Sequence, residues 1–288
     1  MAAMGCDLPK NRSIRNYRKR MADPSPYRTI AVASTFSPRF DQVLSEAKRV
    51  RDRFGSELSL IYVGDQTKEV AERFSTALRR LSLPENSAIH YEQGDPAAGI
   101  LRAIERHGID LIIAGALEKE IVLHPFLGNV ARRLLREGRN SVMLFTNPQR
   151  EPKPLRKFVF IAEYSDHAAK ALRLTLYFAA LEKSERVYVI RVITTFDEAR
   201  AAKGGRSSDD SDEEAKLEQF VLALGDIEVP TEVRCIRGNT GFVAADFVKS
   251  VEADLLVVPL DPQKNEGQLP PNLEWLADVI PCNLWVIR

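Results

Sequence analysis

The sequence predicts an α/β protein built from two tandem doubly wound domains, each a five-stranded parallel sheet with helices on both faces. Two observations predict this fold: short apolar runs alternate with segments of helical periodicity, and the same order of elements occurs twice along 288 residues. A chain of this length has room for two domains of ordinary size. Its hydrophobic content of 44% and charged content of 28% are typical of globular proteins.

The first half shows the alternation clearly. Residues 29–34, "TIAVAS", form a short apolar run that predicts a buried strand. Apolar positions between Phe40 and Phe54 then follow the 3, 4, 7 spacing of one helical face. Further strands are expected at 58–63, 88–93, 111–115 and 141–145, and further helices at 66–81, 96–107 and 129–136. This order favours a parallel, doubly wound sheet.

The second half starts the same order again. The order starts with "KFVFIAEYS", where a strand is expected, followed by a helix from Asp166 to about Leu181 and a strand at "RVYVIRVI". Between the halves, residues 147–157 carry three prolines and five charged residues, a composition that indicates a linker. We therefore expect domains at 27–147 and 157–288, joined by a linker at 148–156.

The repeat can be followed by the offset between corresponding positions. Ser34 matches Glu163 at an offset of 129, whereas Asp110 matches Asp254 at 144. The difference of 15 indicates a net insertion in the second copy. It falls around "KGGRSSDDSDEEAK", so we expect a solvated acidic loop near 204–214.

Several segments carry a family resemblance. "RTIAVASTFSPRFDQVLSEAKRV", "GDPAAGILRAIERHGIDLIIAG" and "GNVARRLLREGRNSVMLF" resemble a universal stress protein domain, and "KFVFIAEYSDHAAKALRL" resembles the start of a second. The likeness covers about 27–147 and 155–288, so the chain resembles a tandem universal stress protein. The resemblance implies ATP binding at the carboxyl edge of the strands, which is where doubly wound sheets bind ligands. It also implies an acidic residue after the first strand and a G-x2-G-x9-G-[ST] pattern after the fourth.

In the first copy this pattern is only partly present. Gly115 and Gly128 stand at the outer glycine positions, but the middle glycine is Glu118, and Asn129 replaces the hydroxyl residue. A helix beginning at Asn129 would offer backbone N–H groups to phosphate, whereas Glu118 brings a negative charge there. Nearby basic residues that could offset this charge are Lys119, His124, Arg132 and Arg133.

Two interpretations of this segment stay open. The glycines can serve as a turn and a helix start with no ligand, or they can form a nucleotide site in which Ser34 replaces the acidic residue. For the second case, the resemblance assigns the cofactor contacts to Ser34, Val63, Ala114, Gly115, Gly128, Asn129 and Val130.

The second copy has lost the glycines altogether. Pro259, Pro270 and Pro271 stand at the positions of Gly115, Gly128 and Asn129. Proline has no backbone N–H to donate to phosphate, so this copy is not expected to bind a triphosphate. Glu163 does stand at the acidic position after the first strand, as a solvated carboxylate or a contact for a hydroxyl-rich ligand.

The sequence offers no recognised catalytic centre. It contains no G-x-S-x-G elbow and no Walker A motif, and its four histidines lack metal-binding spacing. Three widely separated cysteines indicate neither a zinc site nor a disulfide framework, so a reducing cytoplasm is expected. We therefore predict no enzymatic activity and no metal site, with slow ATP hydrolysis left open.

The N-terminal segment, residues 1–26, is basic. Six basic residues and no acid lie between Lys10 and Arg20, without the apolar region of a secretory signal. Attachment to an anionic membrane surface or a nucleic acid is one interpretation, and a disordered extension is the one we favour. The whole chain carries 41 basic and 40 acidic residues, so no nucleic-acid partner is expected. Its apolar runs are also too short for a membrane span.

These observations predict a cytoplasmic stress-response regulator. Its first domain would sense ATP or another adenine nucleotide, with Mg, and its second domain would be degenerate. The alternative is a protein-interaction module that binds no nucleotide. The final strands "SVMLF" and "NLWVIR" are apolar edges, and the resemblance implies that such edges pair domains. We therefore expect the two copies to pack as a pseudo-symmetric pair, within a homodimer that recognises an unidentified regulatory protein.

Overall fold

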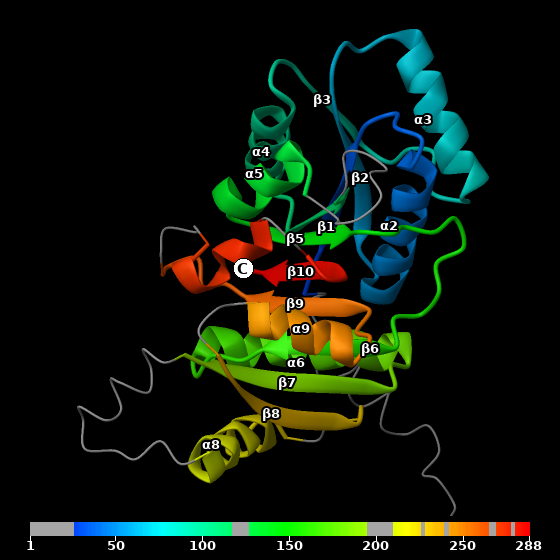
Figure 1. The fold of residues 1–288 in the computed structure, drawn as a ribbon. Helices are drawn as coiled ribbons and strands as arrows, with labels where there is room; N and C mark the ends of the chain where they lie inside the picture. The colour runs from blue at the N-terminus through cyan, green and yellow to red at the C-terminus, as the bar shows by residue number, and fades with distance from the viewer. Residues whose placement is uncertain are drawn as a thin grey trace, which may run out of the picture.

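The protein was analysed as a computed structural model (Figure 1). The structure describes residues 26–116, 127–194, 210–225, 228–238, 242–264, 269–277 and 280–288. The basic segment before Pro26 therefore lies outside the described residues. So do residues 117–126 of the glycine-bounded segment, including Glu118, Lys119 and His124.

The strands of the described residues belong to one 10-stranded sheet in the order β3-β2-β1-β4-β5-β10-β9-β6-β7-β8. The first copy contributes β1 (Thr29–Ser34), β2 (Glu57–Val63), β3 (Ile89–Glu92), β4 (Leu111–Gly115) and β5 (Ser141–Phe145). The second contributes β6 (Lys157–Ile161), β7 (Arg186–Ile193), β8 (Thr231–Arg237), β9 (Leu255–Pro259) and β10 (Asn283–Ile287). Neighbouring strands are parallel within each copy, and β5 and β10 join the copies antiparallel. The predicted fold class and the pairing of the final strands are confirmed.

Helices cover both faces of the sheet. One face carries α2 (Phe40–Phe54), α3 (Lys68–Arg80), α6 (Asp166–Glu182) and α8 (Asp210–Leu222). The other carries α4 (Pro96–His107), α5 (Asn129–Glu137), α9 (Phe242–Ser250) and the 3-10 helix η2 (Pro271–Ala277). Side chains alternate between the faces, so that Ile30 and Val32 pack on the first face and Ala31 on the second. Figure 1 shows the two halves meeting at β5 and β10.

Helix ends follow from local residue chemistry. The Asp95 side chain accepts a hydrogen bond of 2.9 Å from the Ala98 N–H, and Pro96 occupies the first helical position of α4. The same helix ends at Gly108, whose φ of 60° lies in the left-handed region that glycine adopts at low cost. The sequence boundaries predicted for α4 therefore match the structure.

Aromatic side chains fill the joint between the two copies. Phe54 of α2 stacks on Phe178 of α6 with ring centroids 5.0 Å apart, and Trp285 of β10 lies 5.4 Å from Phe178. Trp285 is fully buried, and its indole N–H donates a 3.2 Å hydrogen bond to the hydroxyl of Tyr27, which precedes β1. The first face of the sheet therefore has one core that runs through both copies.

Two aspartates fix the start of each copy in the same way. Asp110 Oδ2 accepts the backbone N–H of Thr29 at 2.8 Å, and Asp254 Oδ2 accepts that of Lys157 at 2.9 Å. The structural offset between the first strands is therefore 128, so the sequence offset of 129 was wrong by one residue. Ala162 is the counterpart of Ser34, and Glu163 corresponds to Thr35.

Part of the segment predicted to be an acidic loop is helical. Helix α8 begins at Asp210, so residues 210–214 are helical, and residues 204–209 lie outside the described residues. Acidic residues near a helix N-terminus are stabilised by the helix dipole. Buried Leu217 and Val221 give this helix its core-facing side. The prediction failed at this end because the acidic composition masked a helical pattern.

Candidate functional site

The predicted site residues lie at the carboxyl edge of the first copy's sheet. β1 lies between β2 and β4, and the chain passes to opposite faces after β1 and β4, which makes this the topological switch point of the first copy. Val32 pairs with Ile113, so Ser34 and Gly115, two residues further along each strand, lie at the same level. Val63 ends the neighbouring strand β2.

The two ends of the glycine-bounded segment are tied together. The Ala116 N–H donates to the Phe145 carbonyl, and the Gly128 N–H donates to the Ala116 carbonyl, both at 2.9 Å. These bonds hold the start of α5 beside the end of β4. Gly115 is exposed at that point, while Ala114 before it is buried. The Gly128 N–H is thus already used by the protein and is not a phosphate donor.

The N-terminus of α5 is the feature best suited to bind an anion. Gly128 is its N-cap, and no side chain caps the first turn. The first N–H groups of an α-helix have no partner within the helix, and the helix dipole favours negative charge there. Asn129 is exposed and Val130 is half-buried. The N–H groups of these two residues are the candidate donors.

The basic side chains of α5 are partly committed elsewhere. Arg133 forms ion pairs with Asp95 and with Glu137, the latter at 2.7 Å. Both carboxylates raise the pKa of the Arg133 guanidinium, and the hydrogen bond from Ala98 is the main cause that lowers the pKa of Asp95. The sequence-based expectation that Arg133 offsets the charge of Glu118 is therefore not supported by its contacts.

Ser34 points into the protein. Its side chain is buried, and its hydroxyl donates to the Val32 carbonyl at 3.2 Å. Thr35 is exposed at the same strand end and is the counterpart of Glu163. Sequence reasoning missed Thr35 because strand residues alone did not fix the offset. The equivalent contacts of Asp110 with Thr29 and of Asp254 with Lys157, which only the structure reveals, show which residues of the two copies correspond.

Val63 is held at the site by α4. A Cβ on Gly99 would lie 2.9 Å from Val63 Cγ2, so only glycine lets this helix approach the end of β2 so closely. Because β2 neighbours β1, Val63 lies across the strand ends from the start of α5. The structure therefore brings all seven predicted residues to one edge of the sheet.

The equivalent edge of the second copy is built differently. Pro259 ends β9 in a buried position, and the Leu260 N–H donates to the Ile287 carbonyl at 2.8 Å, as Ala116 does to Phe145. Where the first copy has α5, this copy has the 3-10 helix η2, which starts at Pro271. Leu273 and Leu276 of η2 are buried in the core. A matching N–H at the first helical position is absent because proline has none.

The histidines and acidic side chains of the described residues do not form a metal-binding group. They contain no group of three or more His, Cys, Asp or Glu side chains able to hold a metal ion. His90 and His107 stack on each other at 3.7 Å, and His167 Nε2 is hydrogen-bonded to the Ile287 carbonyl at 3.1 Å. Within the described ranges, no helix is long and apolar enough to span a membrane.

A scan against protein-family models matched the universal stress protein family at residues 65–146 and 154–288, together well over half of the sequence. This match decides the family. The chain belongs to the universal stress protein family. A search of curated proteins found no match.

Solved structures show the same fold along the whole chain. A putative universal stress protein from Pseudomonas aeruginosa UCBPP-PA14 matches with a TM-score of 0.65 and 14% identity, covering 91% of this chain and 93% of that one. A universal stress protein from Archaeoglobus fulgidus DSM 4304 matches with a TM-score of 0.60 and 13% identity, covering 92% and 99%. A functionally unknown protein from Pseudomonas aeruginosa PAO1 matches at 0.66 and 14%, covering 91% and 92%. At these identities the likeness concerns the fold alone.

Proposed function

We propose that this universal stress protein is a non-catalytic regulator of the stress response whose first domain binds an adenine nucleotide, ATP with Mg²⁺. The observation that carries the proposal is the uncapped N-terminus of α5, which is tied beside the exposed Gly115 at the switch point. The second domain has prolines at the corresponding positions and a 3-10 helix in place of α5. It is therefore the degenerate partner.

Each predicted residue has a definite part in this proposal. The Asn129 and Val130 N–H groups bind phosphate oxygens, and the missing side chain at Gly115 allows the phosphates to approach the strand end. Ser34, Val63 and Ala114 form the apolar and backbone surface beneath the nucleoside. Thr35, whose hydroxyl can donate and accept, stands where relatives have an acidic residue and would contact the ribose. Mg²⁺ would enter with the nucleotide, because it is commonly bound through substrate phosphates.

Nucleotide binding would stabilise one arrangement of α5 relative to β4. A ligand that contacts both elements favours the arrangement in which they are held together, and a partner that recognises α5 would sense the difference. We place this regulator in the cytoplasm and expect a homodimer. Since β5 and β10 already pair within the chain, the dimer must use other surfaces.

A nucleotide-free interaction module is the second candidate. The observation that favours it is the neutralisation of Arg133 by Asp95 and Glu137. Without that side chain, phosphate recognition depends on backbone groups of α5. Under this alternative the switch point of the first copy is structural, and regulation passes through protein contacts only.

The Asn129→Pro variant separates these candidates. Proline is tolerated at the first helical position, and Gly128 already has the extended conformation, φ −62° and ψ 155°, that a residue before proline requires. The substitution removes one N–H donor. Because a hydrogen bond to a charged group contributes about 1.5–3 kcal/mol, we expect equilibrium dialysis with labelled Mg-ATP to show binding about 10- to 100-fold weaker.

The matched control is Lys68→Pro, which changes the first residue of α3 after the extended N-cap Thr67. It should bind Mg-ATP like the unmodified protein. Equal affinity of the Asn129→Pro and Lys68→Pro proteins would refute phosphate binding at α5. Absence of binding by the unmodified protein would favour the interaction module.

A further inference from the structure

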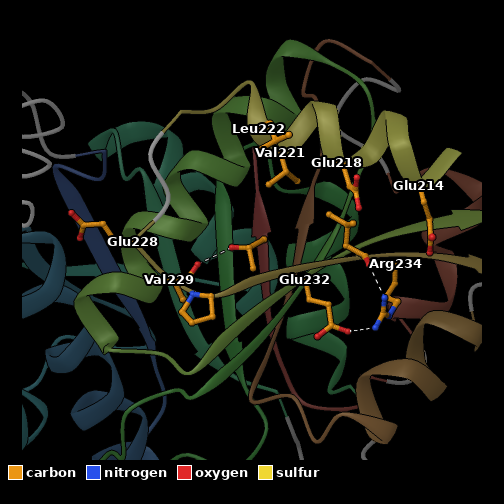
Figure 2. Close-up of a pocket in the computed structure, with 11 residues that line it drawn as sticks. Glu214, Glu218, Val221, Leu222, Glu228, Val229, Glu232 and Arg234 are labelled. Carbon is orange, nitrogen blue, oxygen red and sulfur yellow. Dashed lines mark hydrogen bonds and ion pairs between the residues drawn. The ribbon is translucent and has the colours of Figure 1, made fainter. Parts of the chain in front are cut away.

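A groove lies at the far end of the sheet from the proposed nucleotide site. It has a volume of about 770 Å³ and runs between helix α8 and the edge strand β8. Figure 2 shows Glu214, Glu218 and Val221 reaching toward it from α8, opposite Val229, Glu232 and Arg234. Consecutive residues 228–234 line it, so it follows the strand along its edge and is not restricted to one face.

One part of the groove is apolar. Val221 and Val229 are buried at its floor, with 6% and 5% exposure, while Leu222 beside them is 73% exposed. Pro230 also belongs to the lining. An exposed leucine next to a buried apolar floor is a surface that an apolar side chain of a ligand could cover.

The other part is acidic. Glu214 and Glu218 are one helical turn apart on α8, and neither has an ion-pair partner among the described residues, whereas Lys216 pairs with Glu213. Glu232 is neutralised on the strand side by Arg186 at 2.6 Å and by Arg234 at 2.5 Å. The α8 side of the groove therefore carries a net negative charge from Glu214 and Glu218.

Among the described residues, no strand pairs with the outer edge of β8. β8 is the last strand of the sheet and pairs with β7 on one side. A strand at the edge of a sheet presents N–H and C=O groups outward, and an extended peptide can add to it as a further strand. β8 spans seven residues, whereas β3 at the opposite edge spans four. The longer edge offers more main-chain hydrogen bonds.

We propose that this groove binds the chain's own basic segment, residues 10–20, as an extended strand along β8. The segment carries six basic residues and no acid, which complements Glu214 and Glu218. Ile14 and Tyr17 lie among these basic residues and supply apolar side chains for the floor at Val221 and Val229. Tethering favours this occupant over a free peptide, because it raises the effective concentration of the segment.

The chain is long enough to reach the groove. Tyr27, next to Pro26, is hydrogen-bonded to Trp285 of β10. A strand added outside β8 would lie five strand-to-strand steps from β10, about 24 Å at ~4.8 Å per step. Nine residues separate Pro26 from Tyr17, and in extended form they span ~30 Å. Docking would also cover the open edge of β8 and protect it from pairing with another chain.

The test is zero-length carbodiimide cross-linking of the full-length protein, which joins amines to carboxylates in direct contact. We expect mass spectrometry to find Lys10 or Lys19 joined to Glu214 or Glu218. These links should be lost in the Glu214→Gln/Glu218→Gln variant. They should also weaken in ~1 M salt, where the Debye length is about 3 Å. The matched control is Glu69→Gln/Glu72→Gln, which removes exposed acids from α3 and should leave the links intact.

A second readout does not depend on the acidic residues. In the Arg12→Ser/Arg15→Ser/Arg18→Ser protein, amides of residues 231–237 should exchange at least about tenfold faster than in the unmodified protein. Unchanged exchange would overturn the proposal. So would cross-links spread equally over Glu69 and Glu72, or links found only between labelled and unlabelled molecules in a mixed sample. Neither readout involves nucleotide, so the result is independent of the proposed ATP site.

Discussion

At the scale of single residues, Glu182 links the two copies through a buried carboxylate. Its buried carboxylate accepts hydrogen bonds from Arg49 at 2.7 Å and Arg53 at 2.8 Å, both on α2 of the first copy. It also accepts the Leu155 N–H at 2.9 Å, which fixes the segment between the domains. Arg49 is shared with Glu46, and burial raises the pKa of the Glu46 carboxyl despite that partner.

Replacing Glu182 by Gln should therefore destabilise the protein strongly. Removing one partner leaves the other charges buried without compensation, which typically costs about 3–5 kcal/mol. We expect the free energy of unfolding in urea to fall by about 3 kcal/mol. Glu185→Gln, which breaks a solvent-exposed pair with Arg156, should change it by less than about 1 kcal/mol. Equal effects of the two substitutions would contradict this account.

At the scale of elements, packing of α4 against β3 places two histidines in contact. His90 of β3 stacks on His107 at the end of α4. Burial is the larger cause that lowers the pKa of His90 below its usual 6.5, repulsion from His107 adds to it, and Glu92 opposes both. Because its pKa is lower in the folded than in the unfolded chain, the unfolded chain binds this proton more readily. The contribution of His90 to stability is thus lost as the pH falls below about 6.5.

NMR titration of the imidazole signals tests this arrangement. The midpoint of His90 should lie below 6.5. In the His107→Gln protein it should rise, because the repulsion is removed, but it should stay below the value of an exposed histidine, because burial remains. A midpoint at or above 6.5 in the unmodified protein would show that the two rings do not pack as described.

The elements also show how far sequence reasoning reaches. Apolar spacing and capping residues predicted most strands and helices, and Thr67 explains why the helix expected at 66–81 starts at Lys68. Helix α8 was missed, because its acidic first turns resemble a solvated loop. The offset error that hid Thr35 had a similar origin, since a one-residue shift cannot be seen within an apolar strand.

At the scale of the whole molecule, the two copies form one continuous sheet and not two separate sheets. The structure shows that β5 and β10 pair antiparallel, and the pairing of the copies through these apolar final strands was predictable. The contacts that secure it were not, because Tyr27 meets Trp285 across 258 residues and Arg49 meets Glu182 across 133. Contacts between residues so far apart in the sequence leave no periodic or spacing pattern from which they could be predicted. The groove beside α8 is unpredictable for the same reason.

Trp285→Ala should weaken both copies together. Truncating a buried tryptophan typically costs about 3–5 kcal/mol, and here the cavity opens between Phe54 of one copy and Phe178 of the other. We expect a single unfolding transition at lower urea concentration by far-UV circular dichroism. Phe242→Ala, at a side chain that is 52% exposed, should shift the midpoint little. Two separate transitions would contradict the shared core.

The central claim is that the first copy binds an adenine nucleotide and the second does not. Its most direct test is calorimetric titration of Mg-ATP into the full-length protein after removal of any bound ligand. The account predicts one site per chain, at least about tenfold weaker in the Asn129→Pro protein and unchanged in the Lys68→Pro protein. Two sites per chain, or no heat up to millimolar ATP, would contradict it.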